Sequence, residues 1–146
     1  MRMRKSDYEL LARFRRELRQ FLAFSEQAAQ AVGLSAQQYQ ALLAIKAHAG
    51  RQMTVGELAG ELLVAQHSAS ELADRMVEKG LLTRLADTRD RRRMLLAMTP
   101  AAESLFERLA GTHVDELRRV QPSLVDVLTR LGREIADRGA GPPDPA

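Results

Sequence analysis

The stretch from Thr54 to Thr99 constrains the fold of this chain more than any other part of its sequence. Its pattern predicts a short helix, a tight turn, a second helix that ends at Gly80, and two β-like runs joined by the charged loop 87–93. A helix-turn-helix followed by an arginine-tipped hairpin suits duplex DNA, because the second helix fits the major groove while the hairpin reaches toward the minor groove. The stretch therefore predicts a DNA-binding lobe.

Local signals mark where the helices of this lobe begin. Ser35 with Gln38, and Thr54 with Glu57, have the spacing of a capping box, in which two backbone N–H groups are satisfied reciprocally. Before the second helix of the motif stands Ala65, where Ser or Asp would form a stronger cap. The absence of that cap costs on the order of 1 kcal/mol of helix stability.

Amphipathic segments flank the lobe on both sides. Apolar residues recur at helical spacing from Ser6 to about Gln30, and Thr99-Pro100 begins a helix that Gln121-Pro122 is expected to interrupt before a last helix. The last segment carries Leu and Ile at the spacing of a coiled-coil seam. A lobe of about 65 residues cannot cover both apolar stripes, so we expect a two-fold homodimer. Such a dimer would bind a pseudo-palindromic operator with half-sites about one helical turn apart.

The expected fold is mainly α-helical with a small β-hairpin wing. Residues 1–34 form an N-terminal dimerisation helix and 35–99 the winged helix-turn-helix lobe; 100–138 form C-terminal dimerisation helices, and the tail 139–146 is expected to be disordered.

Composition excludes several classes of function. The chain has no cysteine, which excludes disulfides, thiol redox sensing and cysteine-ligated zinc. It has no apolar run of transmembrane length and no signal peptide, so we expect a cytoplasmic protein. Glycine-rich phosphate loops, zinc-protease motifs and nucleophile elbows are absent from the sequence, so we expect neither an enzyme nor a cofactor or metal. The net charge of +3 is compatible with nucleic acid without requiring it.

The second helix of the motif, Gln66 to Lys79, is the predicted recognition helix. Its first residues should lie deepest in the groove, so the candidates for contacts with base edges are Gln66, His67, Ser68 and Ser70. Glu71 could accept a hydrogen bond from a cytosine amino group, or it could pair with Arg75 one turn later, which we favour. Arg75 is itself a candidate for a phosphate contact.

The charged loop is the predicted wing. We expect Asp87 and Asp90 to hold it by pairing with Arg91 or Arg92, which leaves Arg89 at the tip. A narrow, electronegative minor groove attracts such an arginine. Arg89 and Arg91 are therefore candidate DNA contacts, while the two aspartates and Arg92 stabilise the wing. The alternative is a solvated turn with exposed ion pairs, each worth about 0 to 1 kcal/mol.

The order of these elements, with the segments ELAGELL, ADRMVEKGLLTR, DTRDRR and LAMTP, resembles the MarR family of bacterial winged helix-turn-helix regulators. The resemblance covers about residues 8–138 and is most specific between Leu72 and Thr99. It implies an obligate homodimer whose terminal helices interlock, and a repressor of a neighbouring gene or operon. It also implies release by a small aromatic or phenolic anion bound between the dimerisation helices and the winged lobe. Glu71 departs from the family, whose members often have a basic or small residue there.

The resemblance also suggests where an effector would bind. Arg19, Phe24, His48 and Arg51 lie in segments that often border the family's pocket, and Arg or His could hold a carboxylate while Phe stacks on a ring. For each of the four, ordinary packing or solvent exposure is the simpler interpretation. A competing hypothesis for the whole chain is a winged-helix protein-interaction module without operator binding. The target genes, the effector, and the choice between repression and activation are not encoded in any pattern of this sequence.

Overall fold

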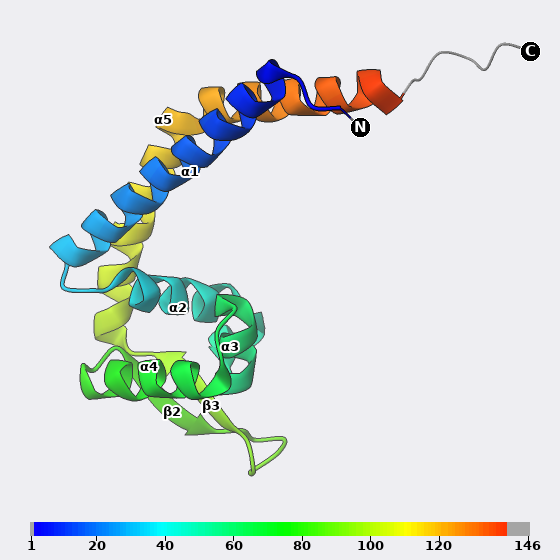
Figure 1. Ribbon diagram of the computed structural model, residues 1–146. Helices are drawn as coiled ribbons and strands as arrows, with labels where there is room; N and C mark the ends of the chain where they lie inside the picture. The colour runs from blue at the N-terminus through cyan, green and yellow to red at the C-terminus, as the bar shows by residue number, and fades with distance from the viewer. Residues whose placement is uncertain (1, 140–146) are drawn as a thin grey trace, which may run out of the picture. The chain divides into compact units, whose positions relative to one another are not determined.

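The computed structural model describes residues 2–139, which contain five α-helices and a small sheet (Figure 1). The elements in chain order are α1 (Lys5–Ala31), α2 (Ala36–Ala47), the 3-10 turn η1 (Ala49–Arg51), β1 (Gln52–Met53), α3 (Val55–Leu62), α4 (Gln66–Glu78), β2 (Leu82–Ala86), β3 (Met94–Met98) and α5 (Pro100–Gly139). The predicted class, mainly α with a β-hairpin wing, is confirmed. None of the helices within 2–139 is long and apolar enough to cross a membrane. Of the tail expected to be disordered, residues 140–146 lie outside the described residues.

The chain divides into two compact units. One combines the residues up to Ser25 with those from His113 onward, and the other is Glu26–Thr112. These divisions differ from the predicted boundaries at 34/35 and 99/100. The reason is that the end of α1 and the first turns of α5 contribute side chains such as Ala29 and Phe106 to the core of the winged lobe.

The winged lobe is built around one apolar core. Its largest fully buried side chains come from three helices and three strands, namely Leu42, Ile45, Met53, Leu58, Met76, Leu82 and Leu96. The sheet has the order β1-β3-β2 with antiparallel pairing, and Met53 lies opposite Leu96 in its register. The predicted strands on either side of the charged loop are therefore present, and Gln52–Met53 adds a third strand of two residues.

The predicted helix starts are confirmed in detail. The Ser35 hydroxyl accepts a hydrogen bond from the Gln38 N–H at 3.0 Å, and the Thr54 hydroxyl accepts one from the Glu57 N–H at 3.1 Å, each within a complete capping box. Ala65, at the start of α4, provides no side-chain cap. Gly80 has φ +73°, the left-handed conformation expected where α4 ends.

The expectation that Gln121-Pro122 would interrupt the C-terminal segment is wrong. α5 runs unbroken from Pro100 to Gly139 with Pro122 inside it. A proline in a helix interior loses one backbone hydrogen bond and strains the preceding turn, but neighbouring residues are held by α1. The Arg13 guanidinium donates to the carbonyl and hydroxyl of Ser123 at 3.2 and 2.8 Å and to the Asp126 carboxylate at 2.8 Å. These contacts lie about 110 residues apart in sequence, so a local signal cannot reveal them.

Candidate nucleic-acid interface

The predicted recognition helix, α4, presents a polar face opposite a buried one. Ala69, Leu72, Ala73 and Met76 are buried in the lobe, at the spacing that one face of a helix requires. The opposite face carries the predicted DNA-facing residues: Gln66, His67, Glu71 and Arg75 are exposed, while Ser68 and Ser70 are half-buried. The structure therefore brings all six to the accessible part of one short helix.

The same face carries an unexpected density of acidic side chains. A carboxylate oxygen of Glu71 lies 3.8 Å from a guanidinium nitrogen of Arg75 one helical turn later, which is the pairing favoured from the sequence. Both side chains are well exposed, so this ion pair is weak. Asp74 accepts a hydrogen bond from Arg84 of β2, a contact that was not predicted. Each of these arginines offsets a carboxylate that would otherwise repel a polyanion.

The wing loop is held by backbone hydrogen bonds, which corrects the expected pairing of Asp87 and Asp90 with Arg91 or Arg92. Asp87 accepts from the backbone N–H of Arg89 at 2.9 Å, and Asp90 accepts from the backbone N–H of Arg92 at 3.0 Å. Aspartate commonly stabilises turns in this way, because its short carboxylate reaches the backbone two residues on. Two further bonds of 3.0 Å, from the Asp87 N–H to the Arg93 carbonyl and from the Arg93 N–H to the Asp90 carbonyl, close the loop.

This arrangement leaves the wing's cations available. The guanidinium groups of Arg89, Arg91 and Arg92 are exposed, and within residues 2–139 none of them forms a salt bridge. An internally hydrogen-bonded loop with three exposed arginines beside an exposed helix face can engage an extended polyanion at several points.

The wing is connected to the lobe through Glu57, whose role beyond capping was not predicted. Its carboxylate lies 2.9 Å from the Arg93 guanidinium and 2.6 Å from Nε2 of His48, and it accepts a hydrogen bond of 3.0 Å from the Thr54 hydroxyl. Burial raises the pKa of Glu57. The hydrogen bonds from Thr54 and the charges of His48 and Arg93 together lower it by more, so the pKa lies below its ordinary value. Glu57 is therefore a carboxylate at neutral pH.

The four predicted effector-binding residues divide between the two compact units. Arg19 and Phe24 belong to the first compact unit and His48 and Arg51 to the second. Phe24 packs edge-on against the buried His113, at a centroid distance of 5.8 Å. His48 is occupied by Glu57, and Arg19 and Arg51 are exposed. Their assignment to an effector pocket stays a prediction.

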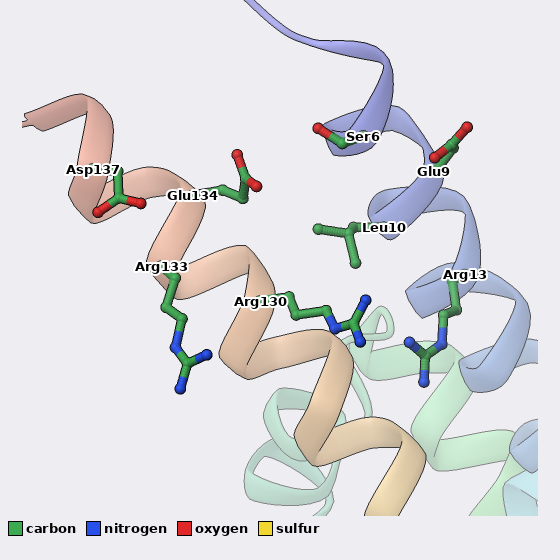
Figure 2. Close-up of a pocket in the computed structure, with 8 residues that line it drawn as sticks. All are labelled: Ser6, Glu9, Leu10, Arg13, Arg130, Arg133, Glu134 and Asp137. Carbon is green, nitrogen blue, oxygen red and sulfur yellow. The ribbon is translucent and has the colours of Figure 1, made fainter.

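The cavities differ in how well they suit a ligand. The one in Figure 2, of about 560 Å³, lies between α1 and α5 in the first unit and is lined by three acidic and three basic side chains, so its charges select for neither anion nor cation. Leu10 points from α1 toward α5, above the guanidinium groups of Arg13 and Arg130 in this view (Figure 2). A smaller, mostly apolar cavity of about 230 Å³ in the second unit includes Arg108 and Leu109. A third, of about 720 Å³, lies between His48 and the wing.

Comparisons with known proteins agree with this geometry. The MarR family model matches residues 32–93, which run from the residue after α1 to the last residue of the wing loop. Over these residues the chain is similar to the MarR family. A curated relative, the transcriptional activatory protein BadR of Rhodopseudomonas palustris, is 36% identical over 84 residues, which is 57% of this chain and 48% of BadR. The chain spans about half the length of the curated relatives it matches.

Solved structures of MarR-family proteins share the fold over most of the chain. AbsC, a MarR-family transcriptional regulator from Streptomyces coelicolor, superposes with a TM-score of 0.72 at 20% identity, covering 97% of this chain and 94% of AbsC. A MarR variant from E. coli complexed with operator DNA superposes with a TM-score of 0.65 at 21% identity, covering 83% of this chain and 89% of that one. At these identities the likeness shows the fold alone.

Proposed function

We propose that this chain is a dimeric, sequence-specific DNA-binding transcriptional regulator. The observation that carries the proposal is the combination of an exposed polar face on α4 with a wing in which Arg89, Arg91 and Arg92 form no salt bridge within residues 2–139. A hairpin that only faces solvent would not need to place unpaired cations next to a helix-turn-helix. The operator complex of the E. coli relative shows that a protein of this fold binds DNA.

The geometry suggests a division of labour among the contacts. The first turns of α4 would enter the major groove, where Gln66 suits adenine and the hydroxyls of Ser68 and Ser70 suit either a donor or an acceptor. Arg75 would contact phosphate, while Arg89 would reach the minor groove. Phosphate contacts would fix the register, and contacts with the base edges would supply selectivity.

Dimerisation is supported by apolar side chains that the single chain leaves exposed. On the two long helices of the first unit, the exposed large apolar residues are Tyr8, Leu11, Leu18, Leu22, Val114, Leu117, Val125, Leu128 and Ile135. Apolar patches of this kind on a helix pair mark an association surface. A second copy would cover them, and its two-fold axis would place two winged lobes on successive major grooves of a pseudo-palindrome.

Regulation by a small aromatic or phenolic acid, binding where the family's members bind theirs, completes the proposal. BadR is named an activatory protein. Whether the present protein represses or activates its target depends on where the operator lies relative to the promoter. A DNA-binding role places the protein in the bacterial cytoplasm and requires neither catalysis nor a cofactor.

Selection of genomic fragments by the purified protein tests this function. Repeated rounds should enrich a pseudo-palindrome whose half-sites are about one helical turn apart. Enrichment of no common sequence, with uniform weak binding to all fragments, would instead favour a winged-helix protein-interaction module.

A further inference from the structure

We propose that Glu57 is a positioning residue that holds the wing against the helix-turn-helix through Arg93, so that Arg89 is presented to DNA. This inference deepens the proposed function and rests on it for its DNA-binding consequence. The consequence for the wing itself can be measured without DNA.

The outer half of the hairpin has little packing to hold it in place. Leu85 and Met94 lie at the ends of β2 and β3 that are next to the loop, and the two residues are 39% and 48% exposed. The cavity of about 720 Å³ separates this part of the hairpin from the η1 turn, and both Glu57 and Arg89 line it. A hairpin next to open space is free to move unless a specific contact restrains it.

Two ion pairs connect the hairpin to the two helices of the motif. Arg84 of β2 pairs with Asp74 of α4, near the inner end of the hairpin. Arg93, at the end of the wing loop, pairs with Glu57 of α3. Among residues 2–139, the pair with Glu57 is the only side-chain hydrogen bond or ion pair that joins residues 85–94 to the rest of the chain. The position of the wing loop therefore depends on this contact.

The Glu57 carboxylate is itself fixed before Arg93 reaches it. It accepts hydrogen bonds from the hydroxyl and the backbone N–H of Thr54, and His48 contacts its second oxygen at 2.6 Å. A carboxylate already held in one orientation loses little further freedom when it binds a guanidinium. An exposed pair between two mobile side chains would lack this advantage.

The substitution Glu57→Gln separates positioning from helix capping. Gln is compatible with the third position of a capping box, and the chain shows this at Gln38, which caps α2 together with Ser35. Glu57→Gln should therefore retain the start of α3 while it removes the charge that holds Arg93. The matched control is Glu61→Gln, the same change on the same helix, where the exposed Glu61 forms no salt bridge within the described residues.

The two explanations of Glu57 predict opposite effects on DNA binding. If Glu57 acts only as a negative charge near DNA, its neutralisation strengthens binding. If it positions the wing, Glu57→Gln weakens binding although no cation has been removed. Loss of one phosphate contact reduces the salt slope by about 0.9, which corresponds to about fivefold weaker binding at roughly 0.15 M salt.

The test combines a mobility measurement with binding. The chain contains no cysteine, so Thr88→Cys introduces a single site for a nitroxide label on the wing, and electron paramagnetic resonance reports its motion in the free protein. Glu57→Gln and Arg93→Gln should each increase the mobility of the label. The double variant should increase it no further, because both substitutions remove one contact. Arg93→Lys should restore most of the restraint, and Glu61→Gln should change nothing.

The outcomes distinguish this inference from the proposed function. Unchanged label mobility in Glu57→Gln overturns the inference whether or not the protein binds DNA. Increased mobility together with weaker binding supports it. Increased mobility with unchanged or tighter binding overturns the role in presenting Arg89. If the unsubstituted protein shows no selective DNA binding, the proposed function fails, while the mobility result still decides whether Glu57 holds the wing.

Discussion

Adding a side-chain cap to the recognition helix should stabilise the lobe by about 1 kcal/mol. Ala65 occupies the N-cap position before α4 with φ −65° and ψ 150°, and no side chain caps the helix. Ser35, which caps α2, has φ −77° and ψ 159°, and Thr54, which caps α3, has φ −76° and ψ 162°. Because the backbone of Ala65 already has the capping conformation, the hydroxyl of Ala65→Ser can reach the N–H of Ser68 without rearrangement.

The geometry at the other helices sets the expected size of the effect. The hydroxyl-to-N–H distances at Ser35, Thr54 and Thr99 are 3.0, 3.1 and 3.2 Å, all within the normal range. One such cap contributes about 0.5 to 2 kcal/mol. For a chain of this length, about 1 kcal/mol raises the unfolding midpoint by roughly 3 °C.

Thermal unfolding followed by circular dichroism, at one fixed protein concentration, measures this directly. The reverse substitution, Ser35→Ala, should lower the midpoint by a similar amount, because it removes the equivalent bond from α2. Ala65→Asp should stabilise the free protein like Ala65→Ser but weaken DNA binding, because it adds a negative charge at the proposed interface. If neither substitution at Ala65 raises the midpoint while Ser35→Ala lowers it, the argument from backbone conformation is refuted.

Further predictions address the interface, the helix pair and the dimer. Arg89→Ala should weaken binding to operator and random duplexes by a similar factor and lower the salt slope by about 1; an unchanged slope would remove Arg89 from the interface. Gln66→Ala should reduce the preference for operator over random DNA in competition assays, and retained discrimination would count against it. The hydrogen bond from Arg138 lowers the pKa of Asp7 in the folded protein. The ionised Asp7 therefore stabilises the fold above the unfolded pKa of about 4, and this contribution should be lost as the pH falls through the lower folded pKa. Acid titration of Asp7→Asn should lack that loss. Leu128→Asp, at an exposed apolar position, should shift the protein toward monomer in sedimentation at micromolar concentration.

Features encoded by neighbouring residues could be predicted from the sequence. Both capping boxes depend on residues three apart, and the end of α4 depends on Gly80 alone, so each is a local property of the chain. The alternation of apolar residues around the charged loop likewise specifies the hairpin. The placement of Gln66 and Arg75 on the exposed face of one helix follows from the 3.6-residue period.

Features that depend on distant residues could not be predicted. Pro122 is a strong local signal for a helix end, but α5 continues through it. The next residue, Ser123, accepts a hydrogen bond from Arg13 of α1, which is distant in sequence. Arg93 was part of a charged loop without an assigned partner, and its partner Glu57 lies 36 residues earlier. Asp87 and Asp90 illustrate a third case. The two residues were correctly predicted to stabilise the wing loop, but they accept hydrogen bonds from backbone N–H groups and not from the neighbouring guanidinium groups.

The most direct test of the account is a fluorescence-polarisation titration of the purified protein. The duplexes would be DNA from the region upstream of its own gene and a scrambled duplex of the same composition, each at two salt concentrations and with or without salicylate. The account predicts tight binding to the upstream DNA, much weaker binding to the scrambled duplex, a steep salt dependence for both, and weakening by salicylate. Selective binding that salicylate leaves unchanged would retain the regulator and remove this class of effector. Equal, weak binding to both duplexes, repeated across other genomic fragments, would contradict sequence-specific regulation by this protein.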